Sequence, residues 1–256
     1  MRTTSNPAFR NLPRAGVRGY AGFGSPPAAT GEAGYATTSA ERPMTIDDVV
    51  IKTATTLGVA LATGAVTVLF NAYALALPAM IVGLVLALII IFGRKANAPM
   101  VLLYAAAEGV FLGAITGVFE HIYPGVAFQA IAGTFGVFAA MLIVYKTGAV
   151  RVTPRLTKWI IGATIGAVIV MVANLVVGMF GGDLGIRDGG PMAIIFSLIV
   201  IGIAAFNLLL DFDQADKLIR AGAPAKMAWY VAFGLTVTLV WLYLEILRLL
   251  SYMQRG

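Results

Sequence analysis

The chain has 256 residues, of which 59% are hydrophobic and 12% are charged, and its formal net charge is +6 at pH 7. This balance is far from that of a soluble domain and is typical of a protein that crosses a membrane several times. Nucleic-acid binding is not indicated, because the basic residues lie between apolar segments, where they set the orientation of a membrane protein. The absence of cysteine excludes disulfides, thiolate metal sites and cysteine nucleophiles.

Residues 1–44 are rich in small residues, proline and arginine and show no sustained apolar periodicity. This composition predicts a disordered basic tail. The first 20 residues lack the continuous apolar stretch of a secretory signal, so the tail is expected to stay on the cytoplasmic side. Residues 45–256 then form the predicted membrane domain.

Seven apolar segments follow, which predicts an all-α polytopic membrane protein with seven transmembrane helices. At a rise of ~1.5 Å per residue, about 20 residues span the ~30 Å hydrocarbon core of a bilayer. Thr45 is the predicted N-cap of the first helix, with Asp47 and Asp48 in the first turn, where the helix dipole favours acids. The predicted spans are residues 45–70, 74–93, 98–119, 125–145, 156–180, 191–212 and 227–250.

Basic residues are divided unequally between the links. The links after the second, fourth and sixth segments carry nine lysines and arginines, whereas those after the first, third and fifth carry only Arg187. By the positive-inside rule the first group is cytoplasmic, which places the amino terminus inside and, after seven crossings, the carboxyl terminus outside. Glu245 and Arg248 in the last segment leave open whether that segment crosses the membrane fully.

The sixth apolar segment ends in acid. Asp211 follows Leu210 directly, without a turn residue, so we expect its carboxylate within the helix. A charged acid at membrane depth costs roughly 2.5 to 3.5 kcal/mol on insertion scales, so it should face protein, water or an ion. Asn207 lies four residues earlier on the same helical face, and its amide could contribute to the same site.

Asp213 is rotated away from that face by two positions, and Asp216 lies beyond Gln214. Lys217 and Arg220 follow them closely, so a solvated, salt-bridged helix end is the favoured interpretation. Asp213 is nevertheless kept among the candidates for an ion pathway.

Two further acids lie within predicted spans. Glu108 stands at a depth where a bare carboxylate is unfavourable, and it could serve an ion pathway or form a neutral hydrogen bond between helices. Glu245 precedes Arg248 by three residues, a spacing that predicts an intrahelical ion pair. Thr238 lies seven residues before Glu245, on the same helical face.

Enzymatic chemistries lack the residues they need. A retinal protein requires a lysine deep in a helix, but the last segment has only Lys226 at its start. A serine protease requires serine with histidine, but His121 lies in a short link. A zinc site lacks ligands. We therefore expect neither an enzyme nor a resident cofactor; Ca²⁺ is considered only as a transported or bound ion.

Three stretches, taken in order, resemble the Bax inhibitor-1 family, also called the transmembrane Bax inhibitor motif family, and in particular its bacterial members. The resemblance covers residues 45–252. Its motifs are Phe92-Gly93-Arg94-Lys95 after the second segment, Leu210-Asp211-Phe212-Asp213-Gln214 in the sixth, and residues 239–248 in the last.

The resemblance implies a central last helix wrapped by six others, in a bacterial inner membrane. It also implies a pH-sensitive calcium leak in which an acid of the sixth helix pairs with an acid of the last helix. On this sequence the sixth-helix acid is Asp211, the basic residue after the second helix is Arg94, and the arginine near the end is Arg248.

The acid of the last helix falls on Thr238, which cannot be a second carboxylate. Either Glu108 or Glu245 substitutes for it, or the pairing is absent and pH control is weaker. Calcium prefers oxygen ligands, so Asp211 is the candidate metal ligand.

Two functions fit these residues. The first is a cation leak or transporter, with calcium as the leading ion and membrane-embedded carboxylates as its pH sensors. The alternative, also implied by the resemblance, is a regulator that does not transport and that binds a membrane protease or another membrane complex, with the basic tail as a contact.

Overall fold

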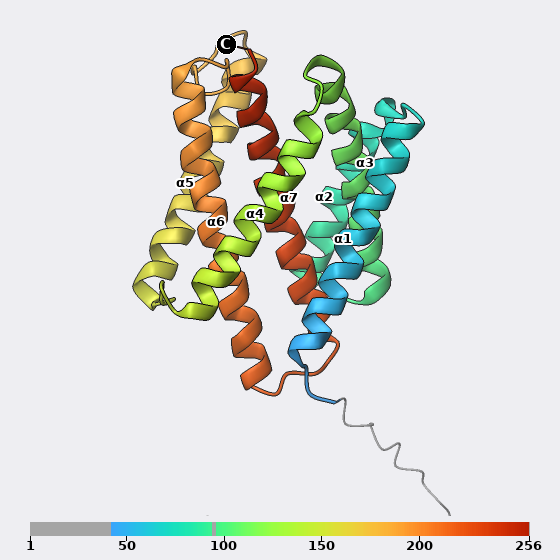
Figure 1. Ribbon diagram of the computed structural model, residues 1–256, viewed down its shortest axis with the longest axis vertical. Coiled ribbons are helices and arrows are strands. Elements are labelled where there is room, and N and C mark those ends of the chain that lie inside the picture. Colours follow the sequence, from blue (N-terminus) through green and yellow to red (C-terminus); the bar gives the residue numbers. More distant parts are fainter. Residues whose placement is uncertain (1–41, 94–95, 256) are drawn as a thin grey trace, which may run out of the picture. The chain divides into compact units, whose positions relative to one another are not determined.

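The computed structural model describes residues 42–93 and 96–255. Over this part of the chain it contains seven α-helices, all long and apolar enough to cross a membrane, which confirms the predicted count and the all-α class (Figure 1). A short 3₁₀ turn, η2 (Tyr73–Leu75), precedes α2. The helices are α1 (Ile46–Leu69), α2 (Ala76–Gly93), α3 (Ala98–Ile122), α4 (Val126–Thr147), α5 (Pro154–Met179), α6 (Pro191–Arg220) and α7 (Met227–Met253).

Helix α1 begins as predicted. The Thr45 hydroxyl accepts a hydrogen bond from the Asp48 amide, and the Asp48 carboxylate accepts one from the Thr45 amide, which completes a capping box. Arg42 also donates two hydrogen bonds to Asp48, at 2.8 and 2.7 Å. Met44 is buried, and its amide donates to the Ala223 carbonyl at 2.7 Å. Residues 42–44, predicted as tail, thus pack with the membrane domain, whereas residues 1–41 lie outside the described residues.

Helix α6 is longer than predicted. It continues eight residues beyond the expected end at 212, so Asp211 is enclosed by helix on both sides. The extension is stabilised by two ion pairs one turn apart, Asp213 with Lys217 at 2.5 Å and Asp216 with Arg220 at 2.8 Å. Their basic members lie in the last turn, where the helix dipole favours positive charge.

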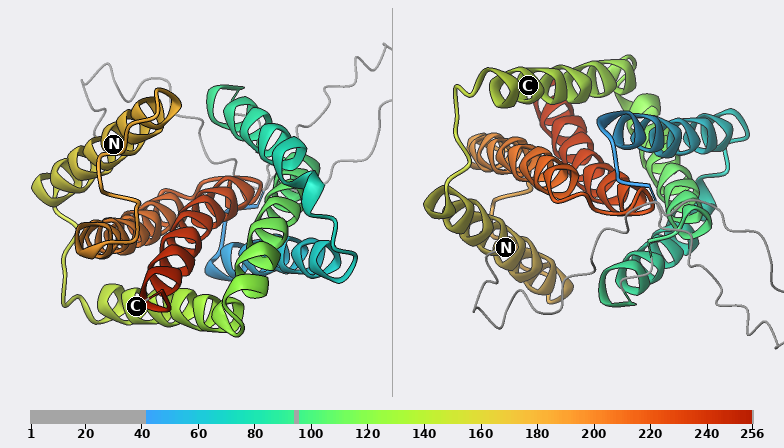
Figure 2. Two further views of the ribbon diagram at one scale, coloured as in Figure 1. Left: turned by 90° about the horizontal axis from the view of Figure 1, so that it is seen from above. Right: turned by 90° about the horizontal axis from the view of Figure 1, so that it is seen from below.

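Helix α7 is the centre of the membrane domain. It packs against α1, α3, α4 and α6, whereas α2 packs mainly on α3, and α5 packs on α6 (Figure 2). Of the seven helices, α7 has the most buried membrane-spanning stretch. The expected central last helix is therefore confirmed, with four neighbours in extensive contact and two helices in outer positions.

Small residues bring α1 and α3 close together. A Cβ on Gly113 would lie 2.7 Å from the Cα of Gly64, and a Cβ on Gly109 would lie 2.8 Å from the carbonyl carbon of Ala60. In a membrane, helices associate through close packing because lipid is as apolar as their side chains. The small residues of α1 therefore serve close contact with α3.

The links gather at two ends. At one end, the Lys52 amino group donates to the Ala225 carbonyl at 2.5 Å, which joins the start of α1 to the α6–α7 link. At the other, the Arg255 guanidinium donates to the Tyr123 hydroxyl at 2.8 Å, and the Tyr252 hydroxyl donates to the Arg187 carbonyl at 3.3 Å. We call these the amino-terminal and carboxyl-terminal ends of the domain; α7 runs between them (Figure 1).

Candidate functional site

Asp211 and Thr238 meet between α6 and the central helix. The Thr238 hydroxyl donates to Asp211 Oδ2 at 2.6 Å, and Thr238 itself is buried. The same hydroxyl also lies 3.3 Å from the carbonyl oxygen of Gly234, one turn earlier on α7. Among the described residues no lysine or arginine forms an ion pair with Asp211. Its hydrogen-bond partner, the Thr238 hydroxyl, is a neutral group. A short hydrogen bond to an ionised oxygen is a strong one.

Asn207 faces a different neighbour. Its amide nitrogen donates to the Thr164 hydroxyl of α5 at 2.8 Å and to the Ile203 carbonyl at 2.9 Å. Asn207 and Asp211 are one turn apart on α6, but their side chains bond α5 and α7 respectively. The amide therefore ties the peripheral α5 to the bundle, and its hydrogen bonds do not include Asp211.

Asp213 and Asp216 form the salt-bridged helix end that the sequence favoured. Both acids pair with basic residues one turn later on α6, and Asp216 also accepts a hydrogen bond from the Tyr145 hydroxyl of α4 at 3.3 Å. The Asp213 carboxylate is therefore engaged by Lys217, in contrast to Asp211.

Glu108 lies on α3 and is half-buried. Its carboxylate packs against α2, where a Cβ added to Gly83 would lie 3.0 Å from Glu108 Oε1. The buried ring of Tyr104, one turn earlier, places its hydroxyl beside the same carboxylate. Glycine at position 83 thus makes the room that the acid needs.

Glu245 belongs to a second charged group near the carboxyl-terminal end. It is 2% exposed, and its Oε1 accepts from Arg248 at 2.6 Å and from Arg187 at 3.3 Å. The predicted pair with Arg248 is confirmed. Burial, together with repulsion from Arg248, lowers the pKa of Arg187 below its usual value. Arg187 was not predicted at this site; the only signal was its isolation as the single basic residue of the links on that side.

Metal binding depends on how many ligand side chains lie close together. Among the described residues, no group of three or more histidine, cysteine, aspartate or glutamate side chains could hold a metal ion. Calcium in proteins takes six to eight oxygen ligands. Asp211 could offer a passing cation one carboxylate, with water or backbone carbonyls completing the shell.

Comparison with protein families shows to which family the chain belongs. The family model described as Bax inhibitor 1 like matches residues 6–255, nearly the whole chain. The chain belongs to the Bax inhibitor 1 like family. No curated protein matches it significantly.

Membership in the Bax inhibitor 1 like family confirms the resemblance found in the sequence motifs, and the match extends into the segment predicted as tail. Of the residues aligned by that resemblance, Asp211 and Thr238 are in contact. Arg248 is paired with Glu245. Arg94 lies outside the described residues.

Proposed function

We propose that this protein of the Bax inhibitor 1 like family conducts cations across a bacterial inner membrane, with its amino terminus in the cytoplasm and calcium as the leading ion. The contact between Asp211 and Thr238 carries the proposal. A carboxylate enclosed by a membrane-spanning helix is bonded to a neutral hydroxyl of the central helix, without an ion pair among the described residues. Intramembrane acids of this kind mark ion pathways because they are costly to keep there.

In this mechanism the ionised Asp211 attracts the cation, and water supplies most of the remaining ligands. The small number of carboxylates favours passage over tight storage, because high-affinity calcium sites combine several acidic side chains. Protonation of Asp211 removes the attracting charge. Flux is therefore expected to fall as the pH is lowered.

Thr238 has two effects in the same mechanism. Its hydroxyl stabilises the ionised carboxylate, and the hydrogen bond fastens α6 to α7. Because threonine occupies the position where the family resemblance implies a second acid, one carboxylate titrates at this contact. The pH dependence should follow a single protonation instead of the two coupled steps of an acid pair.

Calcium flux into dye-loaded proteoliposomes, scanned between about pH 6 and pH 8, tests the proposal. In Asp211→Asn we expect flux at the higher pH to fall by about tenfold or more, the effect of about 1.4 kcal/mol on a barrier, and to lose its pH dependence. Thr238→Val, which keeps the shape but removes the donor, should shift the pH at which flux falls. Asp216→Asn, at the salt-bridged end of the same helix, is the matched control and should resemble the wild type.

Unchanged flux and pH dependence in Asp211→Asn would exclude the proposed role of this acid. If the purified protein gives no flux above that of empty liposomes, the regulator becomes the better hypothesis. Pull-down of membrane proteases with the full chain and with a chain lacking residues 1–41 would then test it; residues 42–44 are kept because they pack with the membrane domain, so that loss of the partner reports on the tail.

A further inference from the structure

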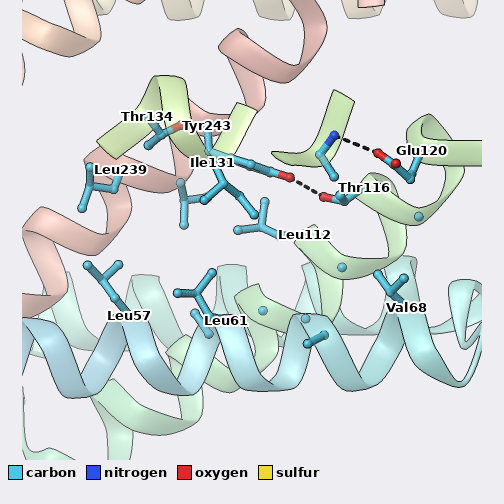
Figure 3. Close-up of a pocket in the computed structure, with 18 of the residues that line it drawn as sticks. Leu57, Leu61, Val68, Leu112, Thr116, Glu120, Ile131, Thr134, Leu239 and Tyr243 are labelled. Atoms are coloured by element: carbon cyan, nitrogen blue, oxygen red, sulfur yellow. Dashed lines mark hydrogen bonds between the residues drawn. The ribbon is translucent and has the colours of Figure 1, made fainter. Parts of the chain in front are cut away.

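A cavity of about 560 Å³ lies on the side of α7 that faces α1, α3 and α4 (Figure 3). On α1 its lining extends from Leu57, near the middle of the helix, to Leu69 at its end. At ~1.5 Å per residue this length is about 18 Å, close to the ~15 Å that one leaflet contributes to a ~30 Å hydrocarbon core. The cavity thus occupies one half of the membrane, at the carboxyl-terminal end.

The polar side chains of the lining are already bonded within the protein. The Thr116 and Tyr243 hydroxyls bond each other at 2.7 Å, and Glu120 accepts from the backbone amides of Gly125 and Ala127 at 2.6 and 2.9 Å (Figure 3). Thr134 and Thr236 each donate to the carbonyl one turn earlier on their own helices. The walls therefore offer water or an ion little to bind, because a buried water needs several free polar partners.

The cavity opens sideways, between α1 and α4. These two helices both pack on α7, but they are not in extensive contact with each other. Leu61 of α1 and Phe135 of α4 line the cavity and are 49% and 43% exposed. Since both helices cross the membrane, this opening faces hydrocarbon.

We propose that the cavity binds one acyl chain of a phospholipid from the leaflet at the carboxyl-terminal end, with the headgroup near Glu120 and the chain end near Leu57 and Leu239. An empty apolar space would forfeit dispersion contacts that lipid can supply. The length of about 18 Å matches the reach of one acyl chain through its leaflet, and the opening between α1 and α4 gives that chain a path from the bilayer. This inference is independent of the proposed cation flux.

A phospholipid with a diazirine at the end of one acyl chain tests the proposal in proteoliposomes of the full chain. Leu239 is 4% exposed, so lipid outside the protein cannot reach it. After illumination and digestion, we expect labelling at Leu239 and its cavity neighbours within the fragment between Lys226 and Arg248. Labelling of this fragment only at lipid-facing residues such as Val237 would overturn the proposal.

Two tryptophan variants of α1 make the test specific. Ala65 lines the cavity and Ala54 does not, although both are exposed on the same helix. Ala65→Trp should fill the space and reduce labelling at Leu239 several-fold, while Ala54→Trp should leave it unchanged. Equal labelling in both variants would contradict the proposal. Should Ala65→Trp fail to fold, the labelled positions in the wild type still decide it.

Discussion

At the scale of single residues, the acids Asp211, Glu245 and Glu108 are accommodated in three different ways. Asp211 is bonded to a threonine hydroxyl, Glu245 to two arginines, and Glu108 lies against a glycine and a tyrosine. An acid neutralised by two cations has little charge left to offer an ion, whereas one held by a hydroxyl keeps its charge. This contrast separates Asp211, the proposed ion site, from Glu245, whose contacts are those of a structural group.

The structural role of Glu245 predicts a stability effect. Removing one member of a buried ion pair costs ~3 to 5 kcal/mol; because Arg187 and Arg248 keep 22% and 28% side-chain exposure, we expect Glu245→Gln to lower the free energy of unfolding by about 2 to 3 kcal/mol. Asp213→Asn, which breaks a more exposed pair on α6, should cost about 0.3 to 0.5 kcal/mol. Denaturant unfolding in detergent measures both, and equal small losses would show that the buried group contributes no more than the surface pair.

At the scale of helices, neighbours in this domain are joined by different means. Helices α6 and α7 share a buried stripe and a charge-bearing hydrogen bond, while α1 and α3 approach through backbone contact at Gly64, Gly109 and Gly113. The second kind of contact tolerates no added side-chain atom, since the neighbouring atoms are main chain and cannot rotate away. The effect of adding a side chain at a glycine therefore depends on whether that glycine faces the backbone of a neighbouring helix.

Two glycine substitutions should have effects of opposite sign. Gly113→Ala would place a Cβ against the backbone of α1 and, through overpacking, should lower the free energy of unfolding by about 1 to 3 kcal/mol. Gly58→Ala on α1 meets nothing within 4 Å and should raise that free energy by about 0.4 to 1 kcal/mol, because alanine restricts the unfolded chain. Thermal or denaturant unfolding in detergent tests both; stabilisation by Gly113→Ala would show that α1 and α3 can separate freely.

At the scale of the whole molecule, the alternation of the helices places the start of α1 and the α6–α7 link at one end and the finish of α7 at the other. The basic links predict which end is cytoplasmic. The absence of cysteine makes this directly testable, because any introduced thiol is unique in the chain.

We expect Gln254→Cys, at the carboxyl-terminal end, to react with a membrane-impermeant maleimide on intact bacteria. Arg151→Cys, in the α4–α5 link, should react only after the membrane is permeabilised. Both positions are exposed, so access depends on the side of the membrane. The reverse labelling pattern would show that the predicted orientation is wrong and that the proposed acyl-chain site lies in the cytoplasmic leaflet.

The sequence by itself determined the features that depend on neighbours within a few residues or on composition. These are the seven spans, the Thr45 cap, the helical position of Asp211, and the pair of Glu245 with Arg248. Helical geometry fixes such contacts, because residues three or four apart share a face. The central place of α7 followed from family resemblance, not from the residues themselves.

Only the tertiary structure decided which groups from different helices meet. Thr238 contacts Asp211 from 27 positions away, Arg187 reaches Glu245 from 58, and the Asn207 amide turns to Thr164 of α5. A soluble helix shows its buried face as an apolar stripe, whereas a membrane helix is apolar on the lipid side as well. Its sequence therefore shows that it crosses the membrane but says little about which helix it faces, so contacts between helices and the cavity between α1 and α4 emerge only when the bundle is packed.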